Sequence, residues 1–308
     1  MLKQILLPTI ALAFFITPFV GAQVVIKPRP QAPGTFETQV TLNLTQKLTI
    51  MGQELDTGQS RKATTKTVVS QPDSDGNITY SVTNSTFENT MTLPGGIELK
   101  YDSKGENKPQ GTQVDFLIPV FDALAKATTT IVYDKEGGVK SIKIKSEELD
   151  KLDEQAKALV GSDLDSDTIE ANARNELDEF RSEAVKPGDR WEDTTTMNLG
   201  GGAVFELDVT KKYVGVVTQD GKKLHKVEAT YTDVDFEQPA PSPGAPAVTD
   251  SDLEITTGTA ILLFDAEKGQ VVSNKMTLNV KGAITLTVAN MDLPAELKLD
   301  MSISNDIK

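Results

Sequence analysis

Few residues of this 308-residue chain could do chemistry, and the first of them is His225. It is the only histidine, and the chain has no cysteine. Zinc sites built from several histidines and cysteines are therefore excluded, and so is catalysis by a cysteine nucleophile. A Ser-His-Asp triad would need His225, which keeps the alternating spacing of Val227 and Ala229. We interpret it as a strand residue. We predict no catalytic residue, and hence a protein that is not an enzyme.

An acidic run gives the nearest approach to a metal site. Asp163, Asp165 and Asp167 have the spacing of the first three ligands of an EF-hand loop. Thr168 stands where this loop needs glycine, and Arg174 stands where it needs glutamate. The run is better explained as the acidic start of a helix, where carboxylates interact favourably with the helix dipole. We therefore predict no metal and no cofactor.

Trp191 is the one residue that presents a choice between packing and ligand contact. It is the only tryptophan, and it follows Pro187-Gly188 at the start of an expected strand. A lone tryptophan after a tight turn usually anchors packing. The alternative is an aromatic ring that stacks on a ligand, which makes Trp191 the candidate ligand-facing residue.

The elements that must position these residues are mostly strands. From Phe36 to Ile50 the even positions are mainly apolar and the odd positions are all polar, which predicts a strand with one buried face. The same alternation recurs at 78–82, 97–101, 205–209, 227–231, 253–263, 276–280, 284–288 and 297–303. One apolar and one polar face indicate antiparallel pairing. We predict a mainly β fold, with one or more curved antiparallel sheets or a half-barrel.

The strand expected at 253–263 is predicted to keep a single phase. Leu253, Ile255, Ile261 and Leu263 then share one face, with Thr257 and Thr259 between them.

Helix is predicted mainly in one central segment, 146–184. Ser146 can cap a first helix, and Asp167 with Glu170 forms a capping box for a second. Their apolar stripes are Leu149, Leu152, Ala156, Leu159 and Val160, then Ile169, Ala173, Leu177, Phe180 and Ala184. This pattern predicts a helical hairpin that covers a sheet. A shorter helical turn is expected from Pro119 to Ala125.

The first 22 residues are typical of a secretory signal peptide. Lys3 precedes an apolar stretch at 5–16, and Val20-Gly21-Ala22 provides small residues for cleavage after Ala22. We expect an exported protein, periplasmic or extracellular, with no transmembrane insertion because no later apolar run approaches the length of a membrane-spanning helix. The chain carries 45 acidic and 31 basic residues, so nucleic acid is a poor partner.

The mature chain divides by composition. A Pro-rich tether is expected at 23–34, an N-terminal β-rich half at 35–145, and a C-terminal β-rich half at 185–308 with a Pro-rich loop at 237–250. The segments Thr130–Gly138 and Ile261–Gly269 each join an apolar strand to the pattern D-x-E-x-G. Duplication of two similar halves is one interpretation, and two independently chosen hairpin turns is the other.

The segment from Phe121 to Lys145, the helices after it and the turn Val185-Lys-Pro-Gly-Asp-Arg-Trp191 resemble a family of uncharacterised exported bacterial β-rich proteins, characterised by a PGD-x-W turn. The family has no established activity, so the resemblance implies only a fold and an exported location. In outline the chain is also similar to half-barrels of the lipoprotein-carrier type, which bind acyl chains against a concave sheet. That likeness is one of shape.

We expect a non-catalytic binding or scaffolding protein. One version holds an apolar small molecule in the curved sheet. The alternative is a structural component that contacts an envelope protein through its Thr-rich face and Pro-rich loop. A hydrolase that uses acidic residues ranks third, because sugar-binding sites usually carry several aromatic side chains and this chain has one tryptophan.

Overall fold

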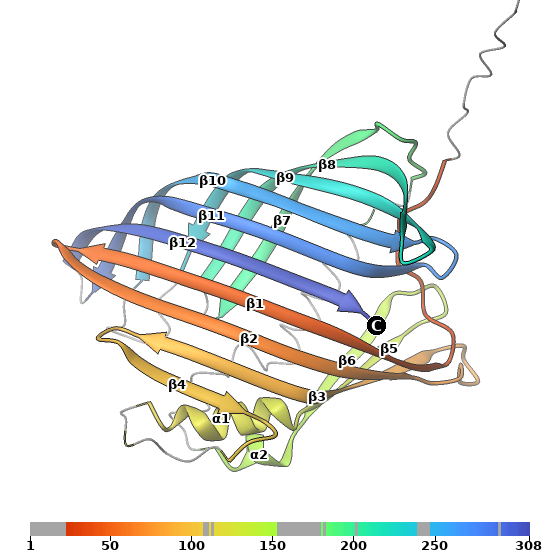
Figure 1. The fold of residues 1–308 in the computed structure, drawn as a ribbon, viewed down its shortest axis with the longest axis horizontal. Coiled ribbons are helices and arrows are strands. Elements are labelled where there is room, and N and C mark those ends of the chain that lie inside the picture. The colour runs from red at the N-terminus through yellow and green to blue at the C-terminus, as the bar shows by residue number, and fades with distance from the viewer. Residues whose placement is uncertain are drawn as a thin grey trace, which may run out of the picture.

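The computed structural model describes residues 23–106, 111, 114–152, 180, 183–200, 203–238, 247–288 and 291–308. Within them, one 12-stranded antiparallel sheet has the order β6-β5-β3-β2-β1-β12-β11-β10-β9-β8-β7, and β4 pairs with β3 beside this path (Figure 1). The strands are β1 (Gly34–Ile50), β2 (Gln53–Val69), β3 (Ile78–Leu93), β4 (Ile97–Asp102), β5 (Thr128–Tyr133), β6 (Val139–Lys145), β7 (Arg190–Gly200), β8 (Ala203–Gln219), β9 (Lys222–Glu237), β10 (Ala247–Asp265), β11 (Gln270–Val288) and β12 (Met291–Ile307).

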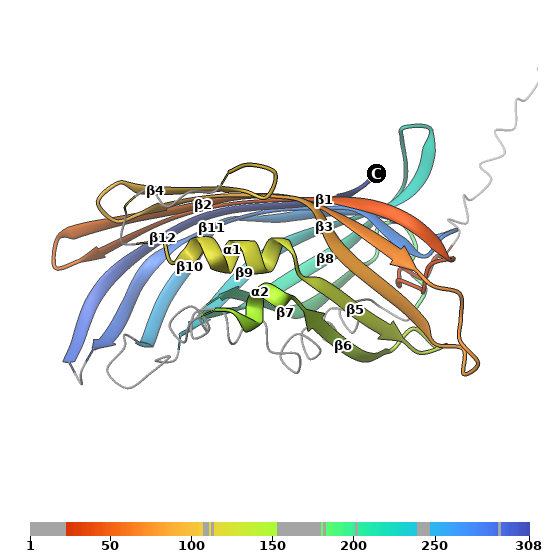
Figure 2. The same ribbon diagram turned by 90° about the horizontal axis from the view of Figure 1, so that it is seen from below.

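The sheet is curved, and its concave face is the apolar one. Figure 2 shows the strands bending around the side on which α1 (Leu117–Ala125) and α2 (Glu147–Asp150) lie. On this face Leu42 of β1 lies opposite Ile303 of β12, and Leu44 lies opposite Met301. All four pack in the largest apolar cluster, which continues across β11 to Phe205 and other residues of β8. The predicted mainly β fold with a curved antiparallel sheet is confirmed.

The two β-rich halves expected from the sequence share this single sheet. β1 pairs with β12 from Thr38, opposite Ile307, to Ile50, opposite Ala295. This pair stands near the middle of the strand order. The halves therefore meet strand to strand, and they bury one continuous apolar face.

The single phase expected for 253–263 is wrong. In β10 the pairing with β11 shifts between Ile255 and Thr257, so one extra residue enters the strand. After this bulge the even positions face inward, and Ala260 packs in the largest cluster. Ile261 is 41% exposed, although Leu263 is buried as expected. A bulge bends a strand and increases its twist, as a long strand in a curved sheet requires.

The helical turn expected from Pro119 to Ala125 is confirmed as part of α1. Its buried side chains Ile118 and Phe121 pack on Phe87 of β3 and Leu99 of β4. The helix therefore covers the concave face at the end of the sheet formed by the N-terminal strands, as Figure 2 shows.

Of the predicted hairpin at 146–184, the structure describes α2, Leu152 and a few residues from Phe180 onward. Ser146 stands at the N-cap of α2, but its side chain makes no capping hydrogen bond, and its Oγ is buried without a partner among the described residues. Leu149 and Leu152 pack on Val120 of α1. The helix from Asp167, and the rest of the predicted hairpin up to residue 179, lie outside the described residues.

The Pro-rich segment at the start of the described chain packs against the sheet. We call residues 23–33 the strap. Val24 and Val185 exchange two backbone hydrogen bonds of 2.9 and 2.8 Å. Ile26 is buried in a cluster with Val185, Tyr213 and Phe264. The segment read as a tether is therefore held along one end of the sheet, at the right in Figure 1.

Candidate functional site

A cavity of about 440 Å³ opens where the strap crosses the concave face. Its volume lies within the range of small-molecule pockets, which is roughly 300–1,000 Å³. Most of the lining side chains are apolar or aromatic: Pro28, Pro30, Phe36, Tyr80, Ile131, Tyr133, Phe180, Leu262, Val271 and Ile307. They come from the strap, β1, β3, β5, β10, β11 and β12, and from residue 180. The cavity therefore depends on the curvature that brings these strands together.

The strap forms one wall of the cavity and is fixed by two hairpin turns. At the β10–β11 turn, Arg29 Nη2 donates to the carbonyl oxygens of Ala266 at 2.8 Å and Glu267 at 3.1 Å. The backbone N–H of Arg29 donates to the carbonyl of Gly269 at 2.9 Å. At the β5–β6 turn, Gly137 lies against Pro30.

These two turns are the D-x-E-x-G segments that the sequence makes similar. In the first, Asp134 Oδ1 accepts from the N–H groups of Glu136 and Gly138, both at 2.9 Å. In the second, Asp265 Oδ1 accepts from the N–H groups of Glu267 and Lys268 at 3.1 and 3.0 Å. The backbone hydrogen bonds hold the pKa of Asp134 below its usual value. The shared pattern builds two tight turns that flank the strap.

Five polar side chains of the described lining are uncharged: Gln31, Thr38, Gln270, Asn274 and Asn305. Arg29 is the charged one. The backbone N–H of Gln31 donates to the Tyr80 hydroxyl. Burial raises the pKa of Tyr80, so this hydroxyl stays protonated at neutral pH and keeps its own hydrogen available for donation.

Trp191 belongs to the apolar cluster beside the cavity. It packs against the cluster of Ile26, Val185, Tyr213 and Phe264, and it is partly buried. It is not among the described residues that line the cavity, whereas its cluster neighbours Phe180 and Val271 are. The contact of Trp191 with a ligand therefore stays a prediction.

His225 lies in β9 and contacts a tyrosine. Its Nδ1 is 2.7 Å from the hydroxyl of Tyr213, and the two rings are stacked with centroids 5.8 Å apart. Burial lowers the pKa of His225 although Asp265 opposes this shift, so the ring is neutral at pH 7 and one of its two nitrogens carries the proton. His225 lies beside Phe264, its cross-strand neighbour in β10, so its role among the described residues is structural.

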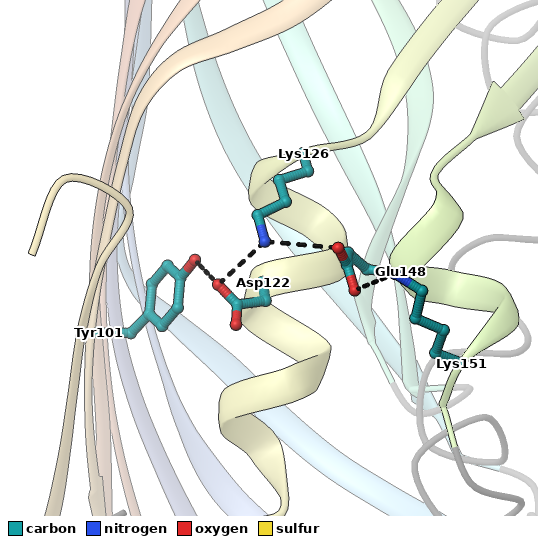
Figure 3. A network of polar contacts seen from close by, with 5 residues as sticks. All are labelled: Tyr101, Asp122, Lys126, Glu148 and Lys151. Carbon is teal, nitrogen blue, oxygen red and sulfur yellow. Dashed lines mark hydrogen bonds and ion pairs between the residues drawn. The ribbon is translucent and has the colours of Figure 1, made fainter. Parts of the chain in front are cut away.

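A second group of polar residues joins α1 to β4 and α2 (Figure 3). The hydroxyl of Tyr101 donates to Asp122 Oδ1 at 2.7 Å. Lys126 Nζ lies 4.0 Å from Asp122 and 3.5 Å from Glu148, and Glu148 also pairs with Lys151 at 3.2 Å. Burial and the nearby Asp122 raise the pKa of Tyr101 well above its usual value. These contacts orient the helices on the sheet rather than forming an open site.

Among the described residues, no group of three or more histidine, aspartate or glutamate side chains is close enough to hold a metal ion. The acidic run Asp163, Asp165 and Asp167 lies outside the described residues. No helix in the part of the chain that the structure describes is long and apolar enough to cross a membrane.

The cavity residues escaped sequence reasoning, although one signal was present. Asn274 precedes Met276, Leu278 and Val280 in the same phase of β11, and Asn305 follows Ile303 in the same phase of β12. Carboxamides at inward-facing positions of two neighbouring strands are unusual in an apolar face. The strap offered a weaker signal, the apolar triplet Val24-Val25-Ile26.

The model of a family of unknown function, DUF6263, matches residues 75–232, about half of the chain. No curated protein matches. Among solved structures, lipovitellin, described for its lipid–protein interactions, has 9% identity and a TM-score of 0.42, over 90% of this chain and 25% of that one. The chain thus spans about a quarter of the lipovitellin chain.

Two bacterial structures are also similar at low scores. A DUF1329 family protein from Desulfovibrio piger has 9% identity and a TM-score of 0.13, over 87% of this chain and 84% of that one. A domain of a putative outer membrane lipoprotein-sorting protein from Vibrio parahaemolyticus has 8% identity and a TM-score of 0.13, over 86% and 84%. Similarities this weak carry no conclusion about function.

Proposed function

The chain belongs to the family of unknown function DUF6263, and from that premise, which assigns no activity, we propose that it is an exported, non-catalytic protein that binds an apolar small molecule in the strap cavity. The matched range contains both the Phe121–Lys145 segment and the PGD-x-W turn. The resemblance to an uncharacterised β-rich family is therefore confirmed, and function must be argued from the site.

The observation that supports the proposal is the cavity of about 440 Å³ on the concave face. A concave apolar pocket with a few polar groups is the usual form of a small-molecule site. Transfer of an apolar ligand from water into such a lining is favoured by roughly 25 cal/mol per Å² of apolar surface buried. The polar groups of the lining would fix the orientation of the ligand.

The test is direct binding of a neutral apolar fluorophore, N-phenyl-1-naphthylamine, to the chain from residue 23 onward. We expect saturable enhancement of its emission. Thr38→Trp should abolish this enhancement, because Thr38 lines the cavity and a larger side chain would fill it. Thr45→Trp is the matched control, since Thr45 lies on the same strand at an odd, exposed position.

Equal binding by both variants, or no binding by the wild-type protein, would contradict a ligand-binding cavity. The second outcome would favour the alternative role, contact with another envelope protein. Native mass spectrometry of protein from its own host adds an independent measurement, because a co-purified apolar ligand should leave on unfolding.

A further inference from the structure

We infer that the ligand of the strap cavity carries an uncharged head group with hydroxyl or amide hydrogen-bond donors, and that Asn305 together with Asn274 selects it. This inference rests on the proposed function and adds the chemical class of the ligand: an apolar chain ending in a neutral polar group, such as a monoacylglycerol.

The two asparagines form a polar pair, and the next two cross-strand pairs on the same face are apolar. Asn274 of β11 lies directly opposite Asn305 of β12 in the antiparallel register. The next pair on the same face is Met276 with Ile303, and the pair after it is Leu278 with Met301. On its other side Asn305 faces Val40 of β1. Apolar packing alone gives no reason for two carboxamides here, and both line the cavity.

Asn305 also has an unsatisfied acceptor. Its Oδ1 is buried, and no hydrogen bond reaches it from the part of the chain that the structure describes. Leaving a buried carboxamide oxygen without a donor is unfavourable, and most such atoms in proteins have a partner. Because Asn305 lines the cavity, rotation of its carboxamide about the Cβ–Cγ bond would present Oδ1 to a hydroxyl or amide N–H of a bound ligand.

The charges around the cavity favour a neutral head group. Among the described lining residues Arg29 is the one with a charged side chain, and its Nη2 is engaged by the carbonyl oxygens of Ala266 and Glu267. No carboxylate is among them to neutralise a cationic head group. A carboxylate ligand would in turn bring its negative charge towards the acceptor Oδ1 of Asn305. A cation in the cavity would be desolvated without a partner, and a carboxylate at Asn305 would meet an acceptor instead of a donor, whereas a neutral donor meets neither penalty.

The experiment compares three ligands with the same dodecyl-length chain and different head groups. They are monododecanoylglycerol, dodecanoate and dodecyltrimethylammonium, each used to displace N-phenyl-1-naphthylamine. We expect the glycerol ester to displace the probe at a concentration about tenfold lower than either ion, a ratio that corresponds to about 1.4 kcal/mol. Asn305→Leu should remove this preference and retain binding of the probe.

Asn279→Leu is the matched control. Asn279 lies in the same strand as Asn274 but in the odd phase, away from the cavity lining. It should keep the wild-type preference. Asn274→Leu serves as the second variant if Asn305→Leu does not fold, and it should weaken the preference in the same direction.

The outcomes separate the inference from the proposed function. If the wild-type protein binds no probe, the proposed function fails. If it binds the probe but dodecanoate or the ammonium ion displaces it as well as the glycerol ester does, the head-group inference fails while the binding function stands. An unchanged preference in both asparagine variants would also overturn the inference.

Discussion

Gly269 leaves the space in which Arg29 lies. A Cβ atom placed on Gly269 would be 2.5 Å from Arg29 Nε and 2.9 Å from Arg29 Cβ. The same glycine has a backbone φ of +65°, which residues with a side chain rarely adopt. The β10–β11 turn therefore needs glycine at position 269 for two reasons. The backbone there has a positive φ, and the strap leaves no room for a Cβ atom.

This relationship predicts that Gly269→Ala destabilises the protein more than Gly221→Ala. Gly221 has a φ of +76° in the β8–β9 turn, but a Cβ there would meet nothing within 4 Å. Both variants introduce backbone strain, and Gly269→Ala should lose about 1–3 kcal/mol more because the strap must move. Urea unfolding measures the difference. Equal losses would show that the strap contributes nothing at this turn.

Tyr101→Phe should lower the free energy of unfolding by about 1–2 kcal/mol at neutral pH, because Asp122 loses its 2.7 Å hydrogen bond. The pKa of Tyr101 is raised in the folded protein, so its contribution is present below pH 10, the usual value, and is lost as the pH rises above it. The wild-type protein should therefore lose its advantage over the variant in alkali. An advantage that stays constant at high pH would contradict this assignment.

His225 should make the protein less stable in acid. Its pKa is lowered in the folded state from 6.5, so below that pH the unfolded chain binds the proton more readily. The stability of the wild-type protein relative to His225→Gln should be constant above pH 6.5 and should fall below it. Urea unfolding at a series of pH values provides the measurement. A relative stability that rises in acid would mean that Asp265 outweighs burial.

Trp191→Ala should cost about 3 kcal/mol, at the lower end for a large aromatic side chain because Trp191 is only partly buried. Trp191 is the single tryptophan, so the tryptophan emission of the protein reports on it alone. This emission should be blue-shifted in the folded protein and red-shifted in urea. A small loss of stability, combined with quenching of the wild-type emission by a bound apolar ligand, would instead place Trp191 at the ligand.

Alternation of polarity was enough to predict the curved antiparallel sheet and much of its core. Phe205 and Leu207 alternate with acidic residues in the sequence, and both are fully buried. Leu99 and Tyr101 follow the same rule on a short strand. Each of these positions depends on the side of one strand that faces the core, which is a local property.

The features that were missed depend on contacts between distant segments. The bulge after Ile255 reverses which positions of β10 face inward. A prediction that assumes strict alternation along the strand cannot detect such a reversal. The strap lacks any periodicity, because prolines interrupt it, and its position is set by the turns around Gly137 and Gly269. The cavity was missed with it, since the strap is one of its walls.

The pairing of β1 with β12 has a consequence for how the protein reaches its native state. Partners such as Thr38 and Ile307 are separated by most of the chain, so this contact has nearly the largest sequence separation that the molecule allows. Folding slows as such non-local contacts increase. The centre of the sheet cannot close before β12 is synthesised, and until then β1 lacks one of its two neighbours. We expect the sheet to close slowly and only after β12 has been synthesised, which leaves a long interval in which one edge of β1 is unpaired.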